Sequence, residues 1–180
     1  MNAGGTRIIY SQSNTVRREV KELLVSVCTA ELVVPSKEIW LTSPWLSDVP
    51  LLDNRAGAFR GLGSGWARQE VTLFRVLAEL VRRRSRLVIT TRPFNNWEKY
   101  KRRLADFVGE GPAKGRLFWL EPREELHTKG LIGDGYVISG SMNFTYNGIN
   151  ILDEGLIYET RRAQVAEHRV NFETHYPVPD

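Results

Sequence analysis

Residues 127–143 read HTKGLIGDGYVISGSMN, and this stretch decides the fold of the 180-residue chain. Two short apolar segments flank Asp134-Gly135, a pair that is typical of a tight hairpin turn. Residues i and i+2 of a strand point to the same face, so His127 and Lys129 are expected to project together. The stretch therefore predicts two short strands around residues 128–140, presenting an imidazole beside an ammonium group.

Segments with the periodicity of strands and helices alternate before this hairpin. Apolar, β-rich runs predict strands near residues 38–42, 87–91 and 116–120. Apolar residues spaced three and four apart predict amphipathic helices from about residue 14, over 69–83 and over 95–108. A further strand near 151–159 and a helix from about Arg162 complete the pattern. This order predicts an α/β fold, a mixed β-sheet flanked by helices on both faces.

The length is that of one domain, and we treat residues 1–180 as a single domain. Glycines at positions 57, 61, 63 and 65 predict a long loop or flap over about 50–67. Cys28 is the only cysteine, which indicates a buried core thiol and a reducing, cytoplasmic setting. No segment has the character of a secretion signal or a membrane span, so no membrane association is expected.

Positive charge is concentrated in the middle of the chain. The net charge is +4, but residues 61–120 hold 13 basic and 5 acidic side chains, whereas residues 121–180 hold 5 and 10. Of the 25 basic residues, 19 are arginine, whose planar guanidinium pairs with phosphate through two hydrogen bonds. The charge pattern is compatible with a polyanionic partner and equally with a solvated basic helix face.

Residues after the hairpin turn can complete a phosphate site. Gly140-Ser141 offers close backbone approach and a hydroxyl group, and Asn143 offers an amide donor. Glu154 can accept a hydrogen bond from the second imidazole nitrogen of His127. Each residue alone has an ordinary explanation, as a turn residue or as a buried histidine. Their joint spacing favours phosphate chemistry.

Together these residues resemble the signature of the phospholipase D superfamily, in which His-x-Lys and an aspartate are followed by Gly-Ser-x-Asn. The matching residues are His127, Lys129, Asp134, Gly140, Ser141 and Asn143, and Glu154 stands where small bacterial nucleases of the superfamily place an acidic partner. One residue fewer than usual separates Asp134 from Gly140, which predicts a tighter hairpin. The resemblance implies a phospholipase D-like fold with one half of a two-motif site per chain.

The mechanism implied by the resemblance needs neither a metal nor another cofactor. His127 would be the nucleophile and form a covalent phosphohistidine. Lys129, Ser141 and Asn143 would bind phosphate, Glu154 would orient His127, and Asp134 would be mainly structural. A second motif must supply another histidine, yet neither His168 nor His175 is followed two residues later by lysine. We therefore predict a homodimer that joins two motifs in one active site.

The motif indicates a reaction class and leaves the substrate open. The basic middle of the chain favours DNA, and it predicts contacts from Arg82, Arg83, Arg84, Lys99, Arg102 and Arg103. Aromatic residues near basic segments could stack on bases, namely Trp45, Trp66, Trp97 and Tyr100. The alternatives are a phospholipase D that acts on lipid and a non-catalytic DNA-binding or assembly module.

Residues 35–48, 53–57 and 140–148 resemble small phospholipase D-like proteins of bacterial anti-phage islands, including those of deazaguanine-DNA modification and restriction clusters. This resemblance implies a restriction nuclease that works beside an ATP-dependent helicase or translocase partner.

Overall fold

A computed structural model of the chain describes residues 4–10, 14–63 and 65–178, and a seven-stranded mixed sheet lies at its centre. The strand order is β1-β9-β8-β7-β2-β5-β6. Strands β2, β5 and β6 pair in parallel, and the other neighbours pair antiparallel, which confirms the predicted mixed sheet. The strands are β1 (Thr6–Tyr10), β2 (Glu38–Thr42), β5 (Arg86–Thr90), β6 (Leu117–Trp119), β7 (Gly130–Ile132), β8 (Val137–Gly140) and β9 (Gly155–Glu159).

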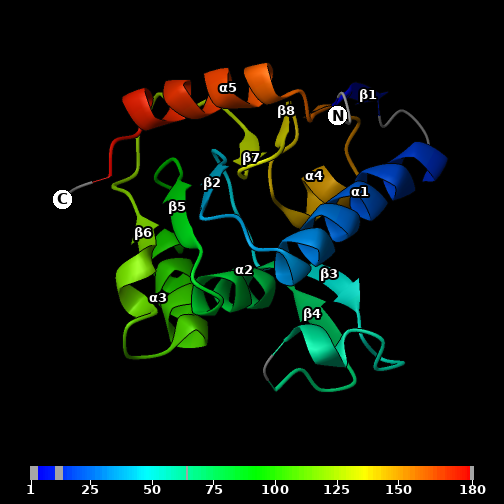
Figure 1. Cartoon of the computed structure of the whole chain (residues 1–180), viewed down its shortest axis with the longest axis vertical. Coiled ribbons are helices and arrows are strands. Elements are labelled where there is room, and N and C mark those ends of the chain that lie inside the picture. Colours follow the sequence, from blue (N-terminus) through cyan, green and yellow to red (C-terminus); the bar gives the residue numbers. More distant parts are fainter. Residues whose placement is uncertain (1–3, 11–13, 64, 179–180) are drawn as a thin grey trace.

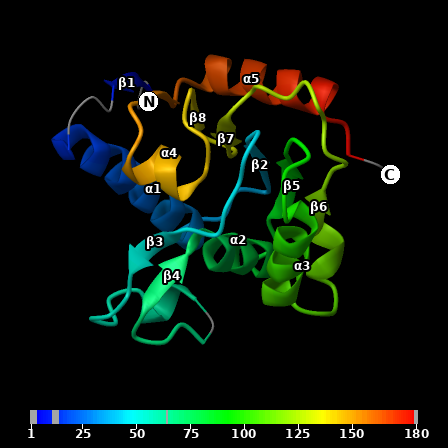
Figure 2. The same ribbon diagram turned by 180° about the vertical axis from the view of Figure 1, so that it is seen from behind.

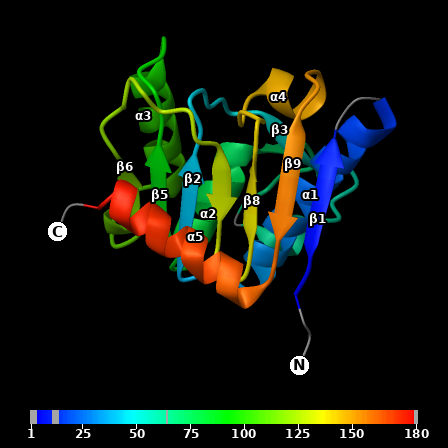
Figure 3. The same cartoon turned by 90° about the horizontal axis from the view of Figure 1, so that it is seen from above.

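Helices cover both faces of this sheet, as predicted (Figures 1 and 2). Helices α1 (Asn14–Val33), α2 (Leu73–Arg82) and α3 (Trp97–Val108) lie on one face, and α5 (Arg162–His175) crosses the other (Figure 3). The short helices are α4 (Tyr146–Asn150) and two 3₁₀ turns, Arg60–Leu62 and Lys114–Arg116. None of the described helices combines the length and the apolar character needed to cross a membrane.

Each face of the sheet has its own apolar core. The larger core lies under α1, α2 and α3 and includes Phe74 and Leu131, and the smaller core lies under α5 and includes Ile132 and Phe172. Neighbouring residues of β7 thus enter different cores, as the alternation of a strand requires. Cys28 is buried in the larger core, where desolvation raises the pKa of its thiol to about 12, so the predicted unreactive core thiol is confirmed.

The prediction of a loop or flap over residues 50–67 is wrong for part of this segment. Strand β3 (Pro50–Asp53) pairs antiparallel with β4 (Glu70–Thr72), and the predicted second helix therefore begins only at Leu73. The turn between these strands is held by Asn54, whose Nδ2 donates to the Ala67 oxygen at 2.9 Å and whose Oδ1 accepts from Phe59 N at 2.8 Å. A buried asparagine that bonds two distant backbone groups gives this glycine-rich stretch a defined structure.

Strand β1 is an element that sequence reasoning missed. It pairs along its whole length with β9, from Thr6 opposite Glu159 to Tyr10 opposite Gly155. Thr6 Oγ1 donates to Glu159 Oε2 at 2.6 Å, and Arg161 Nη2 lies 2.7 Å from the same oxygen. A pairing between residues this far apart in the chain leaves no local periodic signal, so β1 could not be recognised from its own five residues.

Glu159→Gln is expected to lower the melting temperature at neutral pH, with the difference disappearing in strong acid. The Arg161 guanidinium and the Thr6 hydroxyl hold the pKa of Glu159 at about 2, below its usual value of 4.5. Between about pH 2 and pH 4.5, the folded protein therefore keeps this carboxylate ionised, whereas in the unfolded chain the same group binds a proton. The contribution to stability is complete above about pH 4.5 and is lost as the pH falls through about 2.

Thermal unfolding of the wild type and the variant between pH 7 and pH 2 measures this dependence. Glu121→Gln is the matched control, because Glu121 is exposed and bonds none of the described residues. A constant difference between Glu159→Gln and wild type over the whole pH range would contradict the assignment.

Candidate active site

His127 and Lys129 lie in the extended segment that leads into β7. Gly130 pairs with Thr42, the last residue of β2, so the motif emerges at the sheet edge where the parallel strands β2 and β5 end. We call this the motif edge. The His127 side chain is exposed in a small hollow that His175 and Tyr176 also line. Lys129 is half-buried, and its Nζ donates to the carbonyl oxygen of His127 at 2.5 Å.

Ser141 and Glu154 form a hydrogen-bonded unit at the same edge. Ser141 follows β8, and Glu154 precedes β9, which pairs with β8. Ser141 Oγ donates to Glu154 Oε2 at 2.5 Å and accepts from Gly155 N at 3.0 Å. Sequence reasoning expected Glu154 to accept from His127, but strand pairing places this carboxylate opposite Ser141 instead. The His127 ring hydrogen-bonds no residue in the described part of the chain.

Asn143 is placed by Ser43, a residue that sequence reasoning did not assign to the site. Ser43 follows β2, and its Oγ accepts from Phe144 N at 3.1 Å and lies 3.5 Å from Asn143 Oδ1. The same hydroxyl donates to the Trp45 oxygen at 2.7 Å. This buried serine therefore joins the loop after β2 to the loop after β8. A Ser-Pro turn directly after a buried strand was the available signal.

Asp134 lies in the turn between β7 and β8, at the end of β7 remote from His127. Its Oδ2 accepts from Lys37 N at 2.8 Å, and its Oδ1 accepts from Arg169 Nη1 at 3.2 Å. Its own N–H donates to Ser36 Oγ at 2.8 Å. Asp134 thus ties the hairpin to the start of β2 and to α5, a placement that fits the structural role implied by the resemblance.

The prediction that Arg82, Arg83 and Arg84 guide DNA to the site does not fit their placement. Helix α2 runs antiparallel to β5, so its last residues lie at the sheet edge opposite the motif edge. Arg82 donates to the backbone oxygens of Phe107 and Val108, and Arg83 donates to those of Leu32 and Leu62. Two of the three arginines therefore join helices and loops to one another, whereas Arg84 is exposed and stays a predicted contact.

The predicted contacts on α3 have a more favourable position, because α3 starts on the loop that leaves β5 at the motif edge. Arg103 is nevertheless paired with the buried Asp48 carboxylate, with Nε 2.7 Å from Oδ2. Asp48 Oδ1 also accepts from Phe74 N, so it anchors the start of α2. Lys99 and Arg102 are exposed and pair with no acidic residue in the described part of the chain, so they remain predicted contacts.

The half-buried Arg92 lies over the ring of the exposed Trp45 at the motif edge. Trp45 is 48% exposed, and the Arg92 guanidinium lies 5.9 Å from its ring centre. The Arg92 N–H also donates to the Pro44 oxygen. Trp66 was predicted, like Trp45, to stack on bases. It is buried in the larger core, so this prediction is wrong for Trp66. Trp45 keeps an open aromatic surface beside the motif.

No protein-family model matches the chain, and no curated protein matches it either. Its fold is similar to that of Nuc from Salmonella typhimurium, described as a phospholipase D family member, with 15% identity, a TM-score of 0.58 and coverage of 96% of this chain and 93% of that one. NucT from Helicobacter pylori has 10% identity, a TM-score of 0.56 and coverage of 95% and 94%.

The chain is also similar to part of a larger enzyme. Polyphosphate kinase from Porphyromonas gingivalis has 12% identity and a TM-score of 0.63, with coverage of 97% of this chain and 24% of that one. The chain therefore has the phospholipase D-like fold over nearly its whole length, as predicted.

Proposed function

We propose that this protein is a phosphodiesterase that cleaves nucleic acid, with DNA as the favoured substrate and His127 as the nucleophile. The observation that carries the proposal is the convergence of His127, Lys129, Ser141 and Asn143 on one edge of the sheet. An imidazole next to an ammonium and an amide donor provides a nucleophile and phosphate ligands in one place. The fold shared with Nuc and NucT supports this reading.

The proposed reaction proceeds in two steps. In the first, a ring nitrogen of His127 attacks phosphorus, the new P–N bond forms as the bond to the leaving oxygen breaks, and a second histidine gives that oxygen a proton. In the second, water attacks phosphorus, loses a proton to the second histidine and releases His127. Lys129 and Asn143 bind the non-bridging oxygens. The Ser141 hydroxyl already donates to Glu154, so this pair positions the backbone that follows β8.

A second copy of the chain is the proposed source of the second histidine. Helix α5 covers only part of its face of the sheet (Figure 3). On the uncovered part, Ile8 and Tyr10 of β1 and Ile157 of β9 are 56%, 62% and 41% exposed. Their neighbours Ile9 and Leu156 point into the larger core, so the exposed side chains share the opposite face. An exposed apolar patch of this kind is typical of a surface that binds another protein, here a second copy.

The double variant Ile8→Asp/Ile157→Asp is expected to be a monomer with little cleavage activity, although its motif is intact. Charges on facing residues of two adjacent strands would have to be desolvated in the dimer. Light scattering measures the mass, and Val34→Asp is the control, because Val34 is an exposed apolar residue outside this patch. A fully active monomer would contradict the shared site, and loss of its activity in His175→Ala would then assign the second histidine to the same chain.

Cleavage of single- and double-stranded DNA in excess EDTA tests the proposed function. Cleavage that persists in EDTA supports the metal-independent mechanism. Salt-sensitive binding without cleavage would support the non-catalytic DNA-binding module, and hydrolysis of phospholipid vesicles in place of DNA would support the lipid reading. The exposed Trp45 ring with its Arg92 neighbour and the exposed basic residues Lys99 and Arg102 favour nucleic acid.

For the biological setting, we propose restriction of phage DNA alongside an ATP-dependent helicase or translocase. This proposal has the support of the resemblance of residues 35–48, 53–57 and 140–148 to small proteins of anti-phage islands. Co-purification of such an ATPase with the chain tests it.

A further inference from the structure

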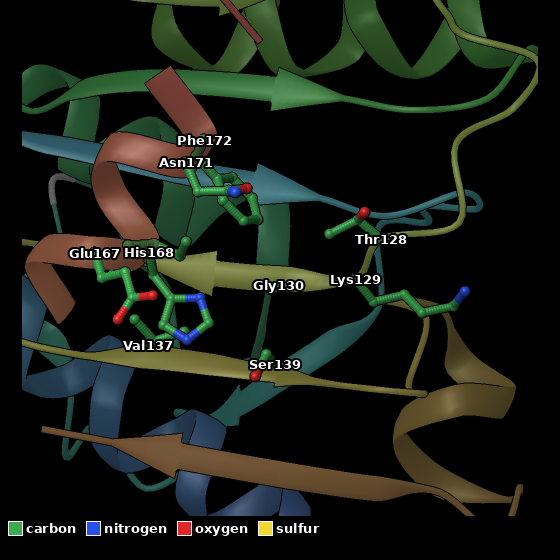
Figure 4. Close-up of a pocket in the computed structure, with 10 residues that line it drawn as sticks. Thr128, Lys129, Gly130, Val137, Ser139, Glu167, His168, Asn171 and Phe172 are labelled. Carbon is green, nitrogen blue, oxygen red and sulfur yellow. The ribbon is translucent and has the colours of Figure 1, made fainter. Parts of the chain in front are cut away.

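A cavity of about 360 Å³ lies between α5 and the strands β7 and β8 (Figure 4). Its floor is apolar and is made by Ile132, Val137 and Phe172. Its rim is polar and combines side chains of α5 with Ser139 of β8. The α5 residues on the rim are Glu167, His168 and Asn171. Thr128 and Lys129 form the end of the cavity nearest the motif edge.

The polar side chains of the rim are available to a ligand. Glu167, His168, Asn171 and Ser139 make no side-chain hydrogen bond or ion pair within the described residues, although His168 and Ser139 are half-buried. Figure 4 shows the His168 ring lying over the strands beside Val137, with Ser139 and Asn171 nearby. The set contains a carboxylate acceptor, an amide, an imidazole and a hydroxyl, so it offers donors and acceptors together.

The glycine that follows the catalytic motif lets Phe172 pack close to the sheet at the floor of the cavity. A Cβ at Gly130 would lie 3.5 Å from the Phe172 ring and 3.3 Å from the Ile138 oxygen. Gly130 pairs with Ser139, so any side chain on this face of β7 would enter the space between Phe172 and Ser139. A larger side chain at position 130 would therefore displace Phe172 or fill part of the cavity.

Lys129 belongs to the motif and also lines the cavity, so the two sites are adjacent. The Lys129 backbone lines the cavity, whereas its side chain extends along the motif edge, away from His168 (Figure 4). Residues 128 to 132 of an extended strand span about 13 Å at 3.3 Å per residue. The cavity therefore begins at the residue that the proposed function assigns to phosphate binding, and the base of the same nucleotide would enter it at the Thr128–Lys129 end.

We propose that this cavity binds the unpaired nucleobase of a nucleotide next to the scissile phosphate. The inference rests on the proposed nuclease function and names its substrate class as single-stranded or locally opened nucleic acid. An apolar floor with donors and acceptors at the rim suits a flat heterocycle, and the volume is in the range of small-ligand sites. A phosphate alone fits poorly, because the Glu167 carboxylate lies on the rim. A base within a duplex must leave its stack to enter such a pocket.

Binding of short oligonucleotides to the His127→Ala protein tests the proposal without cleavage. Fluorescence anisotropy compares a labelled single-stranded pentanucleotide with versions that carry one abasic unit at each position in turn. We expect one abasic position to weaken binding by about tenfold, and His168→Ala and Asn171→Ala to weaken binding of the intact strand by a similar factor. In those two variants the abasic effect should disappear.

Val170→Ala is the matched control, because Val170 is on the same helix but is 63% exposed and outside the cavity. Equal affinity for intact and abasic strands would overturn base recognition, as would full competition by inorganic phosphate alone. Failure of the nuclease proposal has a different readout, namely no cleavage by the wild-type protein while the abasic effect on binding remains.

Discussion

Replacement of His127 by alanine is expected to lower DNA cleavage in EDTA by at least about 10⁴-fold, while the protein folds normally. A nucleophile that forms a covalent intermediate cannot be replaced by solvent at comparable rates, and its loss removes the contribution of the whole catalytic group. The His127 side chain is exposed and bonds no described residue, so its removal should change the free energy of unfolding by less than about 0.5 kcal/mol. A loss of DNA cleavage in this variant would therefore reflect the missing nucleophile and not unfolding.

His175→Ala is the control for this experiment. Both histidines line the same small hollow, and both are exposed, but His175 comes from the end of α5 and its Nδ1 lies 2.8 Å from the Asn171 oxygen. Cleavage rates under single-turnover conditions, with stability measured on the same samples, separate the two variants. A His127→Ala protein that retains more than a few per cent of wild-type cleavage would contradict the assignment of the nucleophile.

The sequence predicted the elements that depend on local periodicity. Buried runs such as residues 87–90 and the apolar spacing of α2 and α3 follow from neighbours within a few positions, and the structure has these elements near the predicted bounds. The hairpin of β7 and β8 is equally local, because the Asp134-Gly135 turn joins strands that are adjacent in sequence. The pairing of β7 of this hairpin with β2 joins residues far apart in the chain, so it leaves no local signal in the sequence.

The partners of charged side chains were beyond the reach of the sequence. Arg82 and Arg83 form a basic cluster in the sequence, but the Arg82 guanidinium donates to the backbone of α3 at Val108. The Arg83 guanidinium donates to the backbone oxygens of Leu32 in α1 and of Leu62. Glu154 was expected beside His127, but the pairing of β9 with β8 places its carboxylate where it accepts a hydrogen bond from Ser141. Spacing along the chain identifies which residues can do chemistry, whereas the fold decides which of them are already committed to structure.

Gly140 belongs both to the Gly-Ser motif and to the last position of β8, so the motif and the fold both constrain it. Gly140 has φ +150°, a backbone conformation that residues with a side chain rarely adopt. A Cβ at this position would collide with the backbone oxygen of Gly155, the residue whose N–H donates to Ser141 Oγ. Relief of the collision must move β8 away from β9, and with it the Ser141–Glu154 pair.

Gly140→Ala is therefore expected to destabilise the protein by about 2–4 kcal/mol, through backbone strain and the displaced strand. Gly135→Ala is the matched control, since Gly135 lies in the turn of the same hairpin, has no positive φ and has no atoms within 4 Å of its would-be Cβ. Urea denaturation of the two variants measures the difference. Equal stability of both would show that the Gly-Ser step adapts freely, and the glycine of the motif would then need an explanation in substrate approach alone.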